Sequence, residues 1–303
     1  MSTIQGVIPI LATPFHDDES LDLPSLTRLV EFCAEAGANG VTLLGVLGES
    51  NRLTDAERST LIRTAVQAAA GKLPVIVGCS HTGTAATVAL VEEAMSLGAS
   101  AVMIAPSRQP VPNDETVFDY YVRIARAGAP LVLQDHPAST EVHMRADLIL
   151  RIAAALPEIA CIKAEAVPSP GKIAALKKGL PRPIPVLTGL GGLYGFFDLE
   201  RGSDGFNTGF AFPEVLIAMV QAMVKAELDT VWELYRRYLP LMVFEQQPGL
   251  AIRKEILRLR GLLTSARVRH PGANIDKGAA DQLKALLNRT FPHQDLTRPV
   301  RVE

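Results

Sequence analysis

The sequence predicts an α/β fold, a (β/α)8 barrel that carries a C-terminal helical extension. Three observations predict it: the length of 303 residues, the regular alternation of short apolar runs with longer helical patterns, and a change to helical patterns alone after residue 212. Such alternation is typical of a parallel sheet, and eight units at intervals of roughly 25–30 residues are what a closed barrel requires. We therefore expect the barrel over residues 1–212 and the extension over residues 213–303, as one structural unit.

The eight predicted strands are short apolar runs, most of them bounded by glycine or proline. In chain order they cover residues 6–12, 40–45, 74–78, 101–105, 130–135, 159–163, 185–188 and 205–208. The helical patterns that follow the first seven strands cover residues 23–36, a stretch from about 54, and residues 84–97, 114–127, 146–156, 171–178 and 193–201. Thr54 and Glu57 form a capping box, which marks the start of the second helix. The extension is predicted to hold three helices, over residues 213–239, 249–263 and 278–287.

Composition and charge restrict the expected partners. The formal net charge is −2 and the isoelectric point is about neutral, so nothing favours nucleic acid or an anionic membrane, and small molecules are the expected partners. Cys33, Cys79 and Cys161 are far apart and show no metal-type pairing, which favours a reduced, cytoplasmic protein. No signal sequence precedes Gly6, and no apolar run reaches the roughly 18 residues of a membrane span, so we expect a soluble, unprocessed chain.

The sixth predicted strand ends on a lysine, and this lysine is the main reason to predict an enzyme. Side chains alternate between the two faces of a strand, so Ile159, Cys161 and Lys163 share one side. If that side faces the barrel interior, the amine of Lys163 lies at the mouth of an apolar core, where desolvation lowers its pKa and makes it a nucleophile. The alternative is that Lys163 merely ends the strand and points to water.

In a barrel of this kind the active site lies at the C-terminal ends of the strands. Gly45 and Gly48 follow the second strand and allow a tight loop whose backbone N–H groups can converge on a carboxylate. The alternative is an ordinary tight turn. Asn207 and Thr208, at the end of the eighth strand, are candidate substrate-binding residues, or else they cap the turn that follows.

Several motifs, in order and with matching spacing, carry a resemblance to a known family. They are Thr13-Pro14-Phe15, Asp22, the turn Gly37–Gly40, the loop Gly45-x-x-Gly48-Glu49-Ser50 and the strand end Ile162-Lys163. Over about residues 6–290 the chain resembles the N-acetylneuraminate lyase and dihydrodipicolinate synthase family. The resemblance implies a (β/α)8 barrel, usually a homotetramer, in which Lys163 forms a Schiff base with pyruvate or another 2-oxo acid. It also implies that the loop containing Val46 and Leu47 holds the carboxylate of that acid.

The chain also departs from the pattern of this family. Where the family has the catalytic tyrosine of Tyr-x-x-Pro, this sequence has Gln134, and Val46 and Leu47 replace two threonines of a proton relay. The segment 106–108 lacks an aromatic pair that reaches a neighbouring subunit, and Ser139 stands where dihydrodipicolinate synthases carry an arginine. The chain is therefore a divergent member that is not expected to act in lysine biosynthesis.

His136 is the first candidate for proton transfer in place of the tyrosine. It has the same strand parity as Gln134, so both side chains are expected at the barrel mouth, and an imidazole titrates near pH ~6.5. The alternative is a histidine anchored by hydrogen bonds in a loop. The amide of Gln134 cannot act as a base but can bind a substrate oxygen. The eighth strand, residues 204–213, resembles the variant found in relatives that act on 2-keto-3-deoxy sugar acids.

An iminium on Lys163 would make the neighbouring C3 carbon acidic, which allows aldol addition, retro-aldol cleavage and dehydration without a metal or an organic cofactor. The first hypothesis is therefore a class I lyase acting on a 2-oxo acid and, in the aldol direction, on an aldehyde. The second is a binding or sensor protein of the same fold, which would bind the ligand without turnover. A third, a metal-dependent barrel aldolase or hydrolase, fits poorly because the strand ends supply few paired carboxylates or histidines.

Overall fold

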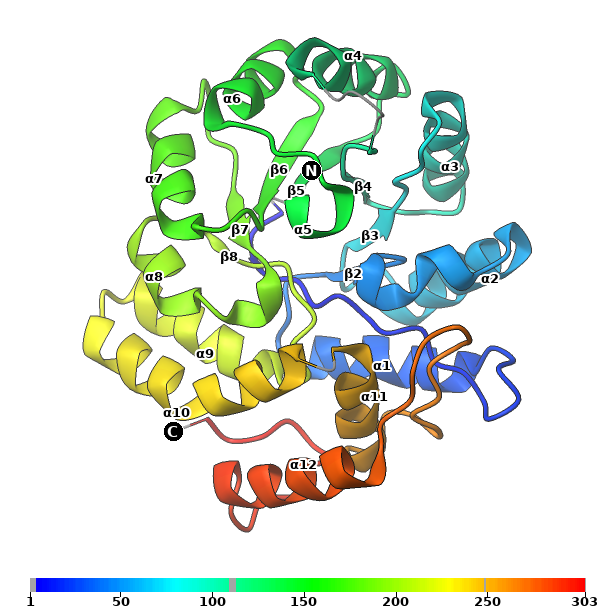
Figure 1. Ribbon diagram of the computed structural model, residues 1–303, viewed down its shortest axis with the longest axis vertical. Helices are drawn as coiled ribbons and strands as arrows, with labels where there is room; N and C mark the ends of the chain where they lie inside the picture. The colour runs from blue at the N-terminus through cyan, green and yellow to red at the C-terminus, as the bar shows by residue number, and fades with distance from the viewer. Residues whose placement is uncertain (1–3, 109–112, 248, 303) are drawn as a thin grey trace.

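The computed structural model describes residues 4–108, 113–247 and 249–302. Within these residues, eight parallel strands form a single sheet in the order β1-β8-β7-β6-β5-β4-β3-β2. Their bounds are β1 Gly6–Val7, β2 Val41–Leu43, β3 Val75–Gly78, β4 Ala101–Ile104, β5 Leu131–Asp135, β6 Ile159–Ala164, β7 Val186–Thr188 and β8 Gly205–Phe206. The sheet closes between β1 and β2 through a parallel bridge from Ile10 to Thr42. The predicted (β/α)8 barrel is therefore confirmed (Figure 1).

Helices surround the barrel and connect its strands (Figure 1). The helices that follow successive strands are α1 Leu23–Glu35, α2 Asp55–Ala69, α3 Thr84–Ser96, α4 Asp114–Ala125, α6 Ala146–Ala155, α7 Ser169–Gly179, α8 Gly195–Glu200 and α9 Pro213–Val224. A short helix, α5 Pro137–Thr140, follows β5 directly and lies over the barrel centre in Figure 1. The predicted capping box is present at the start of α2, where Thr54 and Glu57 satisfy each other's backbone N–H groups.

The barrel is filled by apolar side chains that alternate along its strands. The interior cluster consists of Ile4, Ile8, Ile10, Ile76, Ala101, Met103, Val132, Cys161 and Leu187. Ile162, the next residue along β6, packs in a second apolar cluster, which lies between the sheet and its helices. Burial on both faces explains why the strands read as continuous apolar runs. It also fixes the parity of β6: Cys161 faces inward, so Lys163 does too, at the open end.

The C-terminal region differs from the prediction in one respect. The sequence predicted a single helix over 213–239, but the structure has two, α9 and α10 Leu228–Gln246. The chain turns at Ala226, which adopts the left-handed conformation (φ 60°), and neither glycine nor proline marks this turn in the sequence. α10 then continues through Pro240, where the prediction ended it. The prediction therefore has three helices over residues 213–303, whereas the described residues of this range form four, α9 to α12.

The remaining helices are α11 Leu250–Leu259 and α12 Lys277–Thr290, and they pack with α10 along one side of the barrel (Figure 1). α9 instead packs on β1 and β8, in the place of the eighth barrel helix. The division of the chain at residue 212 stays a prediction. In the described part of the chain, no helix combines the length and the apolar character needed to cross a bilayer.

A buried ion pair joins the extension to the end of the barrel. Arg253 on α11 donates a hydrogen bond from Nε to Glu245 Oε1 on α10 at 2.6 Å, and both side chains are almost fully buried. Glu245 Oε2 also accepts the N–H of Ala211, just beyond β8, at 3.1 Å. The pair therefore fixes the position of α10 and α11 relative to the strand ends.

Replacing Arg253 with methionine should destabilise the fold strongly. The change leaves the carboxylate of Glu245 buried without its counter-charge, and breaking such a pair on one side costs about 3–5 kcal/mol. Urea denaturation would measure this as a lower free energy of unfolding. Adding Glu245→Gln to the same chain removes the uncompensated charge and should recover part of the loss. If Arg253→Met alone unfolds at the same urea concentration as the wild type, the ion pair contributes nothing to stability.

Candidate active site

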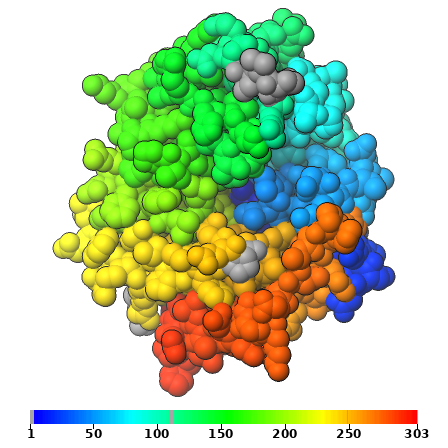
Figure 2. Space-filling view, in the orientation of Figure 1, coloured from blue at the N-terminus to red at the C-terminus, as the bar shows by residue number. Residues whose placement is uncertain are grey.

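A cavity of about 220 Å³ lies at the C-terminal ends of the strands. Its lining residues are Ile10, Val46, Leu47, Gln134, His136, Lys163, Glu165, Leu190, Gly191, Thr208, Gln246 and Gly249. Figure 2 shows this face of the molecule hollowed near its centre, where green, blue and yellow segments meet. The structure thus brings together six of the seven residues that the sequence singled out, all except Asn207.

Lys163 lies at the inner end of this cavity, next to a carboxylate. Its Nζ is 3.1 Å from Oε2 of Glu165, and both side chains are buried. Burial lowers the pKa of Lys163, and the negative charge of Glu165 offsets part of that effect. A lysine amine in such a place reaches its neutral, nucleophilic form at lower pH than an exposed one.

Glu165 is held in place from both sides of its carboxylate. Gln134 donates a hydrogen bond from Nε2 to Oε2 at 2.7 Å, and the N–H of Leu190 donates to Oε1 at 3.3 Å. Burial works to raise the pKa of Glu165, but the charges of Lys163 and His136, with the hydrogen bond from Gln134, outweigh it and lower that pKa. Glu165 is therefore an ionised carboxylate that can take up a proton next to the amine.

Sequence reasoning did not assign a role to Glu165. The signal was present, because Glu165 stands two residues after Lys163 and so shares its side of the strand. The family motif drew attention to the position of the missing tyrosine instead. Gln134, which occupies that position, pairs with Lys163 in the β5–β6 register and bonds to Glu165.

The loop after β7 contains glycines that make room for site residues. A side chain at Gly189 would collide with the carboxylate of Glu165, and one at Gly191 would collide with the amide of Gln246. Gly191 also has a positive φ of 66°, and its N–H donates to Oγ1 of Thr208 at 2.6 Å. The short helical turn Leu190–Gly192 thus connects β7, the carboxylate and the end of α10.

The other predicted residues differ in how close they lie to Lys163 and Glu165. His136 is half-buried, lines the cavity and bonds through Nδ1 to the hydroxyl of Ser139. Asp135, the residue before His136, instead has an oxygen 2.5 Å from Nζ of Lys172. Asn207 donates from Nδ2 to the carbonyl of Ile8 and to Thr42 Oγ1, both at 2.9 Å. It joins β8 to β1 and β2 below the cavity, and a substrate contact at Asn207 stays a prediction.

The glycine-containing loop after β2 forms a short 3-10 turn, Val46–Gly48. The backbone N–H groups of Val46 and Leu47 make no hydrogen bond within the described residues. Glu49 braces the loop from behind, because its buried carboxylate pairs with Lys254 at 2.5 Å and with Arg52 at 2.8 Å. The two N–H groups are thus available to a carboxylate, as the glycine pattern suggested.

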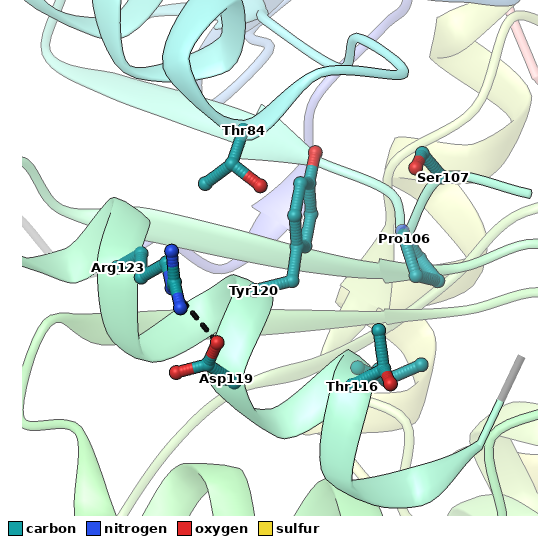
Figure 3. A pocket seen from close by; sticks show the side chains of 8 residues that line it. Thr84, Pro106, Ser107, Thr116, Asp119, Tyr120 and Arg123 are labelled. Carbon is teal, nitrogen blue, oxygen red and sulfur yellow. Dashed lines mark hydrogen bonds and ion pairs between the residues drawn. The ribbon is translucent and has the colours of Figure 1, made fainter. Parts of the chain in front are cut away.

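A second pocket, of about 150 Å³, lies outside the barrel near the starts of α3 and α4 (Figure 3). Its charged residues, Asp119 and Arg123, pair with each other at 2.7 Å. The hydroxyl of Tyr120 is bonded to Thr87 and to the carbonyl of His81. The charged pair and the tyrosine of this pocket thus already have partners, in contrast to the cavity around Lys163. Among the described residues, no three His, Cys, Asp or Glu side chains are grouped so as to hold a metal ion.

Fold and site together define a class of protein: a (β/α)8 barrel enzyme with a desolvated amine and a carboxylate at the C-terminal mouth. The chain belongs to the dihydrodipicolinate synthetase family, whose model matches residues 3–290. The protein is therefore a lyase, as the members of this family are.

Three relatives illustrate the similarity. The chain is 32% identical to L-2-keto-3-deoxyarabonate dehydratase of Azospirillum brasilense, over 95% of each chain. It is 32% identical to 4-hydroxy-tetrahydrodipicolinate synthase of Chlorobium luteolum, over 82% of this chain and 86% of that protein. Among solved structures, dihydrodipicolinate synthase of Rhodopseudomonas palustris superposes with a TM-score of 0.90 at 37% identity, covering 94% of this chain and 97% of that one. Proteins with different substrates thus share this fold and much of this sequence.

Proposed function

We propose that the protein is a Schiff-base hydro-lyase that removes water from a 2-keto-3-deoxy sugar acid. One observation carries the proposal: the ionised carboxylate of Glu165 lies 3.1 Å from the amine of Lys163 and accepts a hydrogen bond from Gln134, the residue at the position of the family's tyrosine. A carboxylate in this place is suited to proton abstraction next to a carbonyl carbon. The dehydratase relative from Azospirillum brasilense supports this choice of reaction.

In the first step the neutral amine of Lys163 adds to the C2 carbonyl carbon of the substrate. The hydroxyl group formed on C2 then takes up one proton from the solvent and leaves as water, which gives a protonated C=N bond that withdraws electrons from C3; the proton is given back when water later releases Lys163. The low pKa that burial gives to Lys163 favours this step at neutral pH. The free N–H groups of Val46 and Leu47 would bind the carboxylate of the substrate.

In the second step Glu165 takes a proton from C3, and the electrons of that C–H bond form an enamine. The enamine then expels the hydroxyl group on C4, which leaves as water after accepting a proton. Glu165 can return the proton it took, or His136, across the same cavity, can supply one. Water then adds to C2 and releases Lys163, so the net change is the loss of one water. Gln134 positions Glu165, and Thr208 completes the cavity wall.

The importance of the position of Glu165 can be tested without substituting Glu165 itself. Gly189→Ala adds a methyl group where the carboxylate of Glu165 lies. We expect kcat to fall about 10²-fold, since small displacements of a reacting group have effects of that size. Gly171→Ala in α7 is the matched control, because a methyl group there meets no atom within 4 Å. Steady-state kinetics that give the same kcat for both variants would argue against an essential position for Glu165.

The proposed reaction is tested by incubating the protein with five- and six-carbon 2-keto-3-deoxy sugar acids and following the products by NMR. Dehydrated 2-oxo products are expected. Release of pyruvate and an aldehyde would instead identify an aldolase. Covalent trapping by borohydride without any product would favour the alternative of a binding or sensor protein.

We further propose a homotetramer located in the cytoplasm, with a 2-oxo acid, and an aldehyde in the aldol direction, as its small-molecule partners. The family resemblance supports the assembly, and three free, buried cysteines are in keeping with a reducing compartment. Native mass spectrometry would give the number of subunits directly.

A further inference from the structure

One wall of the cavity comes from the C-terminal extension, and its polar contribution is Gln246. Gln246 is the last residue of α10, far from the strand ends in sequence, and it lines the same cavity as Lys163. Its side chain lies over Gly191, where a methyl group would collide with its amide. The lack of a side chain at Gly191 is therefore what lets Gln246 reach the site.

Glu165 and Gln246 pack against two different glycines of the loop that follows β7. The carboxylate occupies the space above Gly189, and the amide occupies the space above Gly191. Cα atoms two residues apart are at most about 7.6 Å from each other, because successive Cα atoms are about 3.8 Å apart. Consider a substrate whose C2 is bonded to Lys163 and whose C3 lies next to Glu165. Since C–C bonds are about 1.5 Å long, the carbons beyond C3 would cover the distance from Glu165 to Gln246.

The amide of Gln246 is unusual in this part of the cavity because it has no partner. No hydrogen bond to its side chain is formed by the described residues, while Thr208, nearby, already accepts the N–H of Gly191. The same cavity is also lined by the apolar residues Val46, Leu47 and Leu190. An amide offers both a donor and an acceptor, which suits a hydroxyl group.

We propose that Gln246 determines specificity by binding a hydroxyl group beyond C4 of the substrate. The inference rests on the proposed function, because it takes the substrate to be a sugar acid attached at C2 to Lys163. Gln246 touches no atom that reacts; it selects for length and for hydroxylation of the distal chain. Pyruvate, which has no such chain, should not be affected by this residue.

The test compares two ligands in three proteins. Wild type, Gln246→Leu and the control Gln247→Leu, one residue further and exposed, are incubated with pyruvate or with a five-carbon 2-keto-3-deoxy sugar acid and borohydride. Mass spectrometry measures the concentration of each ligand that gives half-maximal adduct. We expect Gln246→Leu to raise this concentration about tenfold for the sugar acid, the effect of one lost hydrogen bond, and to leave that for pyruvate unchanged.

Two results would overturn the inference. Equal weakening for both ligands in Gln246→Leu would indicate a structural role, and no change for either would indicate that Gln246 does not meet the substrate. The proposed function fails separately: if the wild type traps pyruvate but no sugar acid, the substrate class is wrong, and the specificity role falls with it. If the wild type traps the sugar acid and Gln246→Leu does so equally well, only the specificity role is wrong.

Discussion

Lys163→Met is expected to abolish both the borohydride adduct with pyruvate and all turnover. No other group in the cavity can form the protonated C=N bond, so we expect kcat/KM to fall by about 10⁴ or more, as for other lost nucleophiles. Methionine is unbranched, apolar and adaptable, so it should fill the buried space that the lysine stem occupies. Mass spectrometry of the trapped protein is the primary measurement.

The control for this variant is Lys178→Met, which removes an exposed lysine near the end of α7. The control should keep the adduct and full activity, and peptide mapping should place the adduct on Lys163 in both the wild type and the control. Lys163→Met also leaves the buried carboxylate of Glu165 without its counter-charge, so we expect some loss of stability, although Glu165 keeps its hydrogen bonds from Gln134 and Leu190. An adduct that survives in Lys163→Met would show that another amine is the nucleophile.

Glu165→Gln is expected to separate the two steps of the reaction. Glutamine keeps the shape of the side chain but cannot take a proton from C3, so we expect kcat for dehydration to fall by about 10²–10⁴-fold. The Schiff base itself needs only the amine, so trapping with pyruvate should continue. Steady-state kinetics and trapping are measured on the same preparation. Loss of trapping along with turnover would mean that Glu165 serves mainly to position Lys163.

The same variant should change the pH dependence of trapping in a defined direction. The reactive amine is neutral, so the trapping rate rises with pH through the pKa of Lys163, which burial lowers and the charge of Glu165 raises in part. Glu165→Gln removes that charge and should lower the pKa of Lys163 further. The rise in trapping rate is therefore expected at lower pH in Glu165→Gln than in wild type. A shift toward higher pH would contradict the pairing of the two groups.

The barrel and much of its mouth could be predicted because they depend on local patterns. Apolar runs gave the strands, and alternation along β6 placed Lys163 on the same side as the interior residue Cys161. The loop residues Val46 and Leu47 could be placed because strand ends define the site in this fold. These inferences need only the order of residues within one element.

The missed features depend on how separate elements pack. The break at Ala226 has no glycine or proline, although the left-handed alanine closes α9 locally, with hydrogen bonds from the N–H of Ala226 to Met223 O and from the N–H of Glu227 to Ala222 O. Gln246 reaches the cavity only because α10 continues past Pro240 and ends over the glycine at position 191. The sequence did not show that Asn207 donates from Nδ2 to Ile8 and Thr42 inside the barrel, and a substrate contact at Asn207 stays a prediction. Distances between elements of this kind are not encoded in a local pattern.

The loop Gly189–Gly192 has a consequence for how such enzymes diversify. Its first glycine, Gly189, accommodates the carboxylate of Glu165, just after β6, and its second, Gly191, accommodates Gln246 of α10, so the proposed roles in reactivity and in ligand choice belong to different segments of the chain. A substitution at Gln246 therefore need not disturb Lys163 and Glu165, whereas its neighbour Glu245 must be kept for its pair with Arg253. For protein engineering this makes position 246 a place where the accepted substrate could be changed while the reaction is kept.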